Sequence, residues 1–290
     1  MAVQISTRTH MPGPKKRMMA DMVPGTESPL NFAVSTRDQQ TIDMVAAAIR
    51  HKQVLLAYQP IMQARDQSKV AFYEGLIRVL DETGRVIPAG VFMDTIENSE
   101  LGRQLDTLAL DKGLRALHEI PDLRLSINMS ARSIGYAPWN RTLERWLKKN
   151  ELIAERLILE ITERSAMLVP ELVIDFMDRL QMRGICFAMD DFGAGYTALR
   201  YFKDFCFDVI KIDGQFIQGI ARDPDNQVMT AALISIAKQF DMLTVAEFVE
   251  NKEDADILTQ LGVDCLQGYH FAAATTRPKW MREAHMHQAV

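Results

Sequence analysis

The sequence contains little cysteine, little histidine and no long apolar segment. Three cysteines (Cys186, Cys206 and Cys265) and six histidines occur among its 290 residues. The cysteines lack the spacing of a zinc site and two of them lie inside apolar runs, so we expect reduced core thiols. No apolar run approaches the ~18 residues that a membrane-spanning helix requires. Because no such run follows the basic stretch PKKR either, we expect no secretory signal and a cytoplasmic protein.

The sequence also lacks an excess of positive charge. It has 33 basic and 38 acidic side chains and a net charge of −5, which argues against a protein that binds a nucleic-acid polymer. A small phosphate ligand is compatible with this charge, provided that a bound metal ion inverts the local field. The 48% of hydrophobic residues is typical of a globular protein with a sizeable core.

Residues 1–34 differ in composition from the rest of the chain. They contain four prolines and several serines and threonines but no apolar periodicity, and we predict a disordered tail there. From residue 35 to 285 we predict one folded domain. Its first helix should begin with a capping box formed by Thr36 and Gln39. The apolar face of that helix comprises Ile42, Val45, Ala46 and Ile49.

Eight short apolar runs, with amphipathic segments between the later ones, make up this domain. Each run is too short and too rich in β-branched or aromatic residues for a stand-alone helix, whereas residues 170–184 and 226–240 have helical periodicity. The alternation indicates an α/β protein with a TIM-type (β/α)₈ barrel. The predicted strands are residues 54–61, 70–77, 124–129, 156–162, 185–190, 207–213, 243–249 and 263–269.

The connection between the first two predicted strands departs from that barrel. Only residues 62–69 separate them, whereas a parallel crossover needs about a dozen residues or more. The first strand should therefore run antiparallel to the second. The predicted fold is a modified TIM (β/α)₈ barrel with the first strand antiparallel.

Polar side chains interrupt the C-terminal part of seven successive predicted strands. One acid in a strand usually lies at an edge or faces solvent, but polar positions in register on seven strands are harder to explain, because buried carboxylates are costly unless paired or metal-bound. Barrels of this class place their active sites at the C-terminal rim. A set of oxygen ligands without His or Cys favours Mg²⁺ or Mn²⁺ over zinc and copper. The residues are Glu74, Asn128, Glu160, Asp190, Asp191, Lys211, Asp213, Glu247 and Gln267.

Asp190 and Asp191 are adjacent, although neighbouring side chains on a strand point to opposite faces. We expect the strand to end at this pair, with the following glycines allowing a sharp turn. Asp190 would then face the centre and Asp191 the rim. In this arrangement the pair can address two cations, which together clamp the attacking and leaving oxygens of a phosphodiester.

Residues 193–198, GAGYTA, also match the dinucleotide-binding fingerprint, and Asp213 lies near the expected later acid. Two features argue against a Rossmann domain. Four predicted strands precede the motif, whereas the fingerprint usually opens its domain. Two carboxylates directly before the glycines would repel a pyrophosphate.

Eight motifs occur in the order and spacing of the EAL-domain cyclic di-GMP phosphodiesterases, and from about residue 40 to 275 the chain resembles that family. The resemblance implies a homodimeric hydrolase that uses two ions of Mg²⁺ or Mn²⁺ to convert cyclic di-GMP to linear pGpG. The motifs are YQPI, YEGLIR, SINMSARS, LEITE, MDDFGAGY, VIKIDGQFI, VAEFVE and QGYHF.

The resemblance also implies which residues hold the two ions. Asp190 should bridge them, Asp191 should bind the second ion, and Asp213 is an additional acid close to both. The implied ligands of the first ion are Glu74, Asn128, Glu160 and Asp190.

Three further residues resemble those that act on the attacking water. Lys211 should hold the water, Glu247 should bind metal or activate the water, and Gln267 should contact water or phosphate. The residues alone leave plainer alternatives open, namely a lysine that neutralises core acids and an amide that caps a strand end. We interpret Tyr196 and Tyr269 as packing residues rather than substrate stackers.

Outside the metal site, Glu163 resembles the glutamate that ties down the DDFGAGY loop, which in this family couples dimerisation to metal binding. The alternative for Glu163 is an ordinary surface residue. Arg78 resembles the arginine that reaches a substrate phosphate. Leu76 and Gln59 should line the same cleft.

Three positions depart from the family pattern. Gly75 replaces the alanine of the EAL motif, a minor change that keeps the acid. Phe248 stands where the family usually has Gly, and Val79 where Trp is common, and we expect these two to alter substrate fit or loop motion. All implied metal ligands are kept, which favours an active enzyme. The alternative is a catalytically weak or inactive EAL protein that acts as a cyclic di-GMP receptor or protein-interaction module. We expect regulatory input from the tail, a protein partner, dimerisation or expression level.

Overall fold

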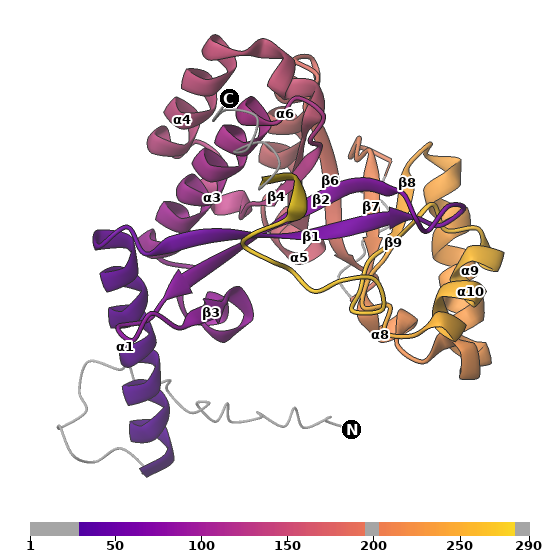
Figure 1. Cartoon of the computed structure of the whole chain (residues 1–290), viewed down its shortest axis with the longest axis horizontal. Helices are drawn as coiled ribbons and strands as arrows, with labels where there is room; N and C mark the ends of the chain where they lie inside the picture. Colours follow the sequence, from indigo (N-terminus) through magenta and orange to yellow (C-terminus); the bar gives the residue numbers. More distant parts are fainter. Residues whose placement is uncertain (1–28, 195–202, 282–290) are drawn as a thin grey trace, which may run out of the picture. The chain divides into compact units, whose positions relative to one another are not determined.

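A computed structural model describes residues 29–194 and 203–281 (Figure 1). The chain divides into two compact units, residues 1–40 and 41–290, and helix α1 (Pro29–Arg50) crosses their boundary. Because α1 begins at Pro29, Thr36 lies inside the helix, and the predicted capping box at the helix start is wrong. Residues 29–34 are helical where the sequence predicted tail. Residues 1–28 lie outside the described residues, so the disordered tail stays a prediction for them.

Eight strands close into a barrel in the second unit. β1 pairs antiparallel with both β2 and β9, whereas the pairs from β2–β4 round to β8–β9 are parallel. The predicted modified TIM barrel is therefore confirmed. Its strands are β1 (Val54–Gln63), β2 (Val70–Leu80), β4 (Leu125–Asn128), β5 (Leu157–Thr162), β6 (Cys186–Phe192), β7 (Val209–Ile212), β8 (Leu243–Ala246) and β9 (Cys265–Leu266).

A ninth strand, β3 (Val86–Pro88), was not predicted. It pairs antiparallel with the end of β2, so that Arg78 lies opposite Pro88. A 3₁₀ turn, η2 (Ala89–Val91), and a short helix, α2 (Met93–Ile96), follow it. β3 thus lies beside the end of β2 and is not one of the eight strands that close the barrel.

Helices cover the outside of the barrel. The two segments predicted as helical form α6 and α9, and each begins with a proline in its first turn, where a missing N–H is tolerated. Helices α3 and α6 pack against β4 and β6, and α9 packs against β8 (Figure 1). None of the helices in the described ranges is long and apolar enough to cross a membrane. The remaining elements are α3 (Glu100–Glu119), η3 (Ala131–Ser133), α4 (Ala137–Lys149), η4 (Glu151–Arg156), α5 (Glu163–Leu168), α6 (Pro170–Gln181), α8 (Gly214–Ile217), η5 (Ile220–Arg222), α9 (Pro224–Gln239) and α10 (Lys252–Leu261).

A buried carboxylate fixes the loop that follows β4. Asp106, on α3, accepts hydrogen bonds from the Ser130 N–H at 3.0 Å and from the Ser133 hydroxyl at 2.6 Å. Burial raises the pKa of Asp106 from 3.8 to about 6, although the two hydrogen bonds oppose the shift. Between these pH values the folded chain retains a proton that the unfolded chain has lost. This contribution to stability is complete below pH 3.8 and disappears as the pH rises through 6.

Replacing Asp106 by Asn should remove this pH dependence, because an amide oxygen can accept the same hydrogen bonds without carrying charge. One pKa unit corresponds to about 1.4 kcal/mol. Between pH 4.5 and 7.5, the free energy of unfolding of the unmodified protein should therefore fall by about 2 kcal/mol relative to that of Asp106→Asn. Asp106→Ala, which leaves both donors unpaired, should be less stable by about 1–3 kcal/mol at both pH values. Urea unfolding of the three proteins measures these differences. A constant gap between the Asn variant and the unmodified protein would contradict the assignment.

Gly75 and Gly113 share one neighbour, the side chain of Ile127. A Cβ atom on either glycine would lie 2.6 Å from Ile127 Cδ1. Ile127 is buried in the core and cannot turn into solvent. A Cβ on Gly75 would also lie 3.0 Å from Leu56 Cδ2. The glycine that replaces the family's alanine is therefore matched to the packing between β2, β4 and α3.

Restoring alanine at position 75 should destabilise the protein by about 1–3 kcal/mol through overpacking. Ile127→Val removes the clashing methyl group and should recover most of this loss in the double variant. Gly90→Ala is the matched control, because a Cβ at Gly90 would meet no atom of the described part of the chain within 4 Å, and it should not destabilise. Denaturant unfolding of the variants measures the coupling. If the destabilisation of the double variant equals the sum of the Gly75→Ala and Ile127→Val destabilisations, Ile127 is not the obstacle.

Candidate metal-dependent active site

A buried lysine lies among four carboxylates at the C-terminal end of the barrel. Lys211, on β7, is 1% exposed. Burying an unpaired charge costs several kcal/mol, so a lysine in this place requires acidic partners. The oxygens nearest to its Nζ are Glu160 Oε2 and Glu247 Oε1 at 2.9 Å, Asp190 Oδ1 at 3.0 Å and Glu74 Oε2 at 3.4 Å.

The acids of this cluster carry more negative charge than one lysine neutralises. Burial raises the pKa of Glu160 to about 8, and the charges of Glu74 and Asp190 add to this effect. Burial and the same two charges raise the pKa of Glu247 well above its usual range, although Lys211 opposes the shift. Burial lowers the pKa of Lys211, but the surrounding carboxylates outweigh it and raise that pKa. The environment therefore favours an additional cation.

Two amides orient Glu74. The Asn128 side chain donates to Glu74 Oε1 at 2.8 Å, and the Gln267 side chain donates to Glu74 Oε2 at 2.6 Å. Gln267 also donates to Gln59 Oε1 at 3.4 Å, and Gln59 stands opposite Glu74 in the β1–β2 register. The antiparallel pairing of β1 with β2 thus places Gln59 beside Glu74.

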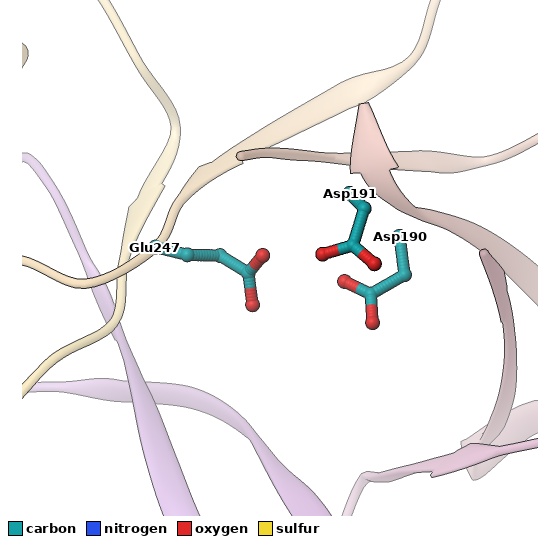
Figure 2. A group of neighbouring side chains, drawn as sticks. All are labelled: Asp190, Asp191 and Glu247. Atoms are coloured by element: carbon teal, nitrogen blue, oxygen red, sulfur yellow. The ribbon is translucent and has the colours of Figure 1, made fainter. Parts of the chain in front are cut away.

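Asp190 and Asp191 reach the same space because the backbone between them is irregular. Strand β6 continues through Phe192, so the prediction that the strand ends at the pair is wrong. The pairing of β6 with β7 shifts register between Met189 and Phe192, and Asp191 has a φ of 55°. Left-handed backbone at a non-glycine residue costs on the order of 1–3 kcal/mol and occurs mainly at functional sites. Figure 2 shows the two aspartates side by side, with their carboxylates directed toward Glu247.

The donor set fits a divalent cation. One carboxylate oxygen from each of Asp190, Asp191 and Glu247 lies within 4.8 Å of the other two. Glu160 Oε1 and Gln267 Oε1 are buried and have no hydrogen-bond partner among residues 29–194 and 203–281. Asp190 Oδ1, although 3.0 Å from Lys211 Nζ, lacks hydrogen-bond geometry. Free oxygens from carboxylate and amide groups are the ligands that Mg²⁺ and Mn²⁺ prefer.

Glu163 and Asp213 lie outside this cluster. Glu163 is 1% exposed, so the alternative of a surface residue is wrong. Its Oε2 accepts a hydrogen bond from the Gly193 N–H at 2.9 Å and thereby holds the end of β6. Asp213 precedes α8 and accepts from the Gln215 N–H at 2.8 Å. Burial raises the pKa of Asp191 to about 6, with further increases from the charges of Asp190 and Asp213.

A cavity of ≈ 600 Å³ opens above the acids. Arg78 lines it and is anchored by a hydrogen bond from its Nη1 to Ile77 O at 2.8 Å. Leu76 and Gln59 line it as well, together with the acids Glu74, Asp190, Asp191 and Glu247. Lys211 and Glu160 are buried and do not line it. The predicted binding residues thus share one cavity with four predicted metal ligands, Glu74, Asn128, Asp190 and Asp191, but not with Glu160 or Asp213.

Several cavity residues were not predicted. Pro88 comes from β3, Ala89 and Gly90 from the 3₁₀ turn η2, and Met93 from the start of α2. Tyr269, interpreted as a packing residue, is 75% exposed and lines the cavity. Tyr196 and most of the GAGYTA motif lie outside the described residues. The turn-forming residues in the segment 82–90 were the sequence signal that could have indicated this part of the cavity wall.

Comparison with known proteins identifies relatives of this chain. The family model of the EAL domain matches residues 42–274. The chain is 30% identical over 226 residues to the cyclic di-GMP phosphodiesterase PdeF of Escherichia coli (strain K12), covering 77% of this chain and 30% of PdeF. It is 31% identical over 242 residues to the cyclic di-GMP phosphodiesterase PdeA of Borreliella burgdorferi, covering 82% of this chain and 36% of PdeA. The chain thus spans about a third of the length of these relatives.

Solved structures resemble the whole barrel. The PaMucR phosphodiesterase in complex with c-di-GMP superposes with a TM-score of 0.74 at 28% identity, covering 81% of this chain and 97% of that one. The cGMP-bound form of the EAL enzyme Bd1971 gives a TM-score of 0.78 at 25% identity, covering 88% of this chain and 71% of that one.

Removing the central lysine should destabilise the metal-free protein severely. Lys211→Met leaves four acids without their counter-charge, and breaking a buried pair in this way costs about 3–5 kcal/mol. Lys252→Met is the matched control, because Lys252 pairs with Asp256 on the exposed side of α10 and such pairs contribute about 1 kcal/mol or less. Urea unfolding in EDTA measures both losses. Equal losses would show that the acids do not depend on Lys211.

Proposed function

The chain belongs to the EAL-domain family, and on that basis we propose that it is a metal-dependent phosphodiesterase that hydrolyses cyclic di-GMP to linear pGpG. One observation carries the proposal most directly. Acids from four segments of the barrel surround one buried lysine beneath a cavity that also contains Arg78. The names of two relatives, PdeF and PdeA, support the same activity.

The oxygen ligands present fit two divalent cations. Mg²⁺ or Mn²⁺ held in pairs supplies Lewis acidity to the attacking and leaving oxygens of a phosphodiester. Asp190 would contribute to both ion sites and Asp191 to the second, and Asp213 stands close by as a further acid. The remaining ligands in this proposal are Glu74, Asn128 and Glu160.

The other residues act on water and substrate. Lys211 would hold the attacking water through its Nζ, and Glu247, 2.9 Å from that nitrogen, would accept a proton from the water or bind metal. Gln267, which orients Glu74, would contact the water or the phosphate. Arg78, which lines the cavity, would bind a substrate phosphate. Glu163 would act indirectly, by holding the end of β6 through the Gly193 N–H.

The predicted homodimer, a regulatory protein partner and a cytoplasmic location belong to the same proposal. The helices that follow Glu163 offer a surface for self-association, since Leu168, Val169 and Leu172 are exposed there.

The test is an assay of the purified protein with cyclic di-GMP and either Mg²⁺ or Mn²⁺, followed by separation of the nucleotides. Linear pGpG should accumulate, and chelation with EDTA should abolish its formation. Glu247→Ala should lower kcat about 10²-fold or more, as expected for loss of a positioned proton acceptor, and should retain nucleotide binding. Arg78→Ala should mainly raise KM, because its interaction exists in both ground and transition states.

Arg85→Ala is the control for Arg78, since Arg85 is exposed and pairs with Asp81 on the surface, and its kinetics should not change. Undiminished hydrolysis after chelation would refute the metal mechanism. Tight binding of cyclic di-GMP without any pGpG would instead support the receptor function.

A further inference from the structure

Phe248 has an unfavourable environment and an unfavourable backbone. It directly follows Glu247 and lines the cavity, yet it is 55% exposed. Its φ of 54° lies in the left-handed region, which glycine adopts far more readily than phenylalanine. Large apolar side chains are usually buried. A stability argument alone would therefore place glycine here.

The left-handed turn does not depend on the ring. The neighbouring Val249 is held on both sides, because its N–H donates to Gln267 O at 2.9 Å and its O accepts from the His270 N–H at 3.0 Å. Gly268 packs so closely on this backbone that a Cβ there would lie 2.0 Å from Val249 O. The loops after β8 and β9 thus impose the backbone conformation on whichever residue occupies position 248.

The ring nevertheless has a defined seat. A Cβ on Gly214, the first residue of α8, would lie 2.5 Å from Phe248 Cδ2 and 2.9 Å from Phe248 Cγ. The backbone of Gly214 is not left-handed, so the space that its missing side chain leaves is used by the ring. One edge of the phenyl group is packed in this way, while more than half of the residue stays open to solvent at the cavity.

A fixed aromatic face above an acidic floor suits a ligand with two chemically different parts. The floor, once loaded with cations, receives a phosphodiester, and the ring receives a flat heterocycle. Nucleobases stack on aromatic side chains with a gain of about 1–3 kcal/mol per base. A second exposed ring, Tyr269, lines the same cavity.

We propose that Phe248 is a base-stacking residue that sets the affinity of this site for a purine dinucleotide. The proposal rests on the function proposed above for the identity of the ligand, cyclic di-GMP. It assigns a binding role to a residue at which the family usually has no side chain. It also explains why the chain retains a backbone conformation that glycine would adopt at lower cost.

Three substitutions separate stacking from packing. Phe248→Gly should raise KM for cyclic di-GMP about tenfold, the loss expected for one stacked base, while kcat changes less than about threefold because stacking acts equally on ground and transition states. Phe248→Tyr keeps the aromatic face and should retain KM within about twofold. Phe248→Leu keeps apolar bulk without a π-face, and should behave like the glycine variant rather than like tyrosine. Phe240→Gly removes an exposed phenylalanine outside the cavity and should leave KM unchanged.

The thermal midpoint supplies a second readout. Phe248→Gly should unfold at the same temperature as the unmodified protein or higher, because glycine relieves the left-handed strain. A variant that is equally stable but binds less tightly is expected from a binding residue. An unchanged or lower KM in Phe248→Gly would overturn the proposal, and so would a parallel loss of kcat and stability.

Calorimetric titration with cyclic di-GMP keeps this test independent of turnover. If the unmodified protein binds but does not hydrolyse, the proposed enzymatic function fails. A dissociation constant that is tenfold higher in Phe248→Gly than in the unmodified protein would then still support stacking. Equal dissociation constants would overturn it, and an unmodified protein that does not bind cyclic di-GMP would overturn both proposals.

Discussion

The C-terminal end of this barrel depends on one buried cation. Lys211 Nζ lies within 3.4 Å of carboxylate oxygens from four segments of the chain. Each acid would be costly to bury without that partner. A one-residue slip of any contributing strand would turn its acid to the opposite face. The same ion pairs that make this end of the barrel expensive to disrupt therefore fix the register of the strands and aim the acids at one point.

Side-chain identity alone does not create the site, because the backbone directs several of its members. Asp191 joins Asp190 through a shift in strand register and a left-handed φ. Gln59 reaches Glu74 because β1 runs antiparallel to β2. These irregularities near the acids are destabilising, and the burial of regular apolar strands in the core offsets them. Functional sites and their scaffolds commonly differ in this way.

The sequence predicts the barrel well because parallel strands buried on both faces give continuous apolar runs. A polar residue inside such a run is informative for the same reason, since burial penalises it, and most of the predicted acids do converge. Features that depend on tertiary pairing were not predictable. Strand β3 is only three residues long, the bulge at Asp191 requires β7, and the left-handed turn that exposes Phe248 requires the β9 loop. Pro29 indicated disorder, although proline is also favoured in the first turn of a helix.

The loops after β8 and β9 pack directly against each other where Gly268 contacts the backbone of Val249. A Cβ would be only 2.0 Å from Val249 O, so neither loop can shift appreciably without the other. Phe248 and Gln267 are the next residues on these two loops, one at the cavity wall and one holding Glu74. The residue after Phe248 is thus tied to Gln267, whose side-chain amide positions the Glu74 carboxylate, by the backbone hydrogen bond from the Val249 N–H to Gln267 O.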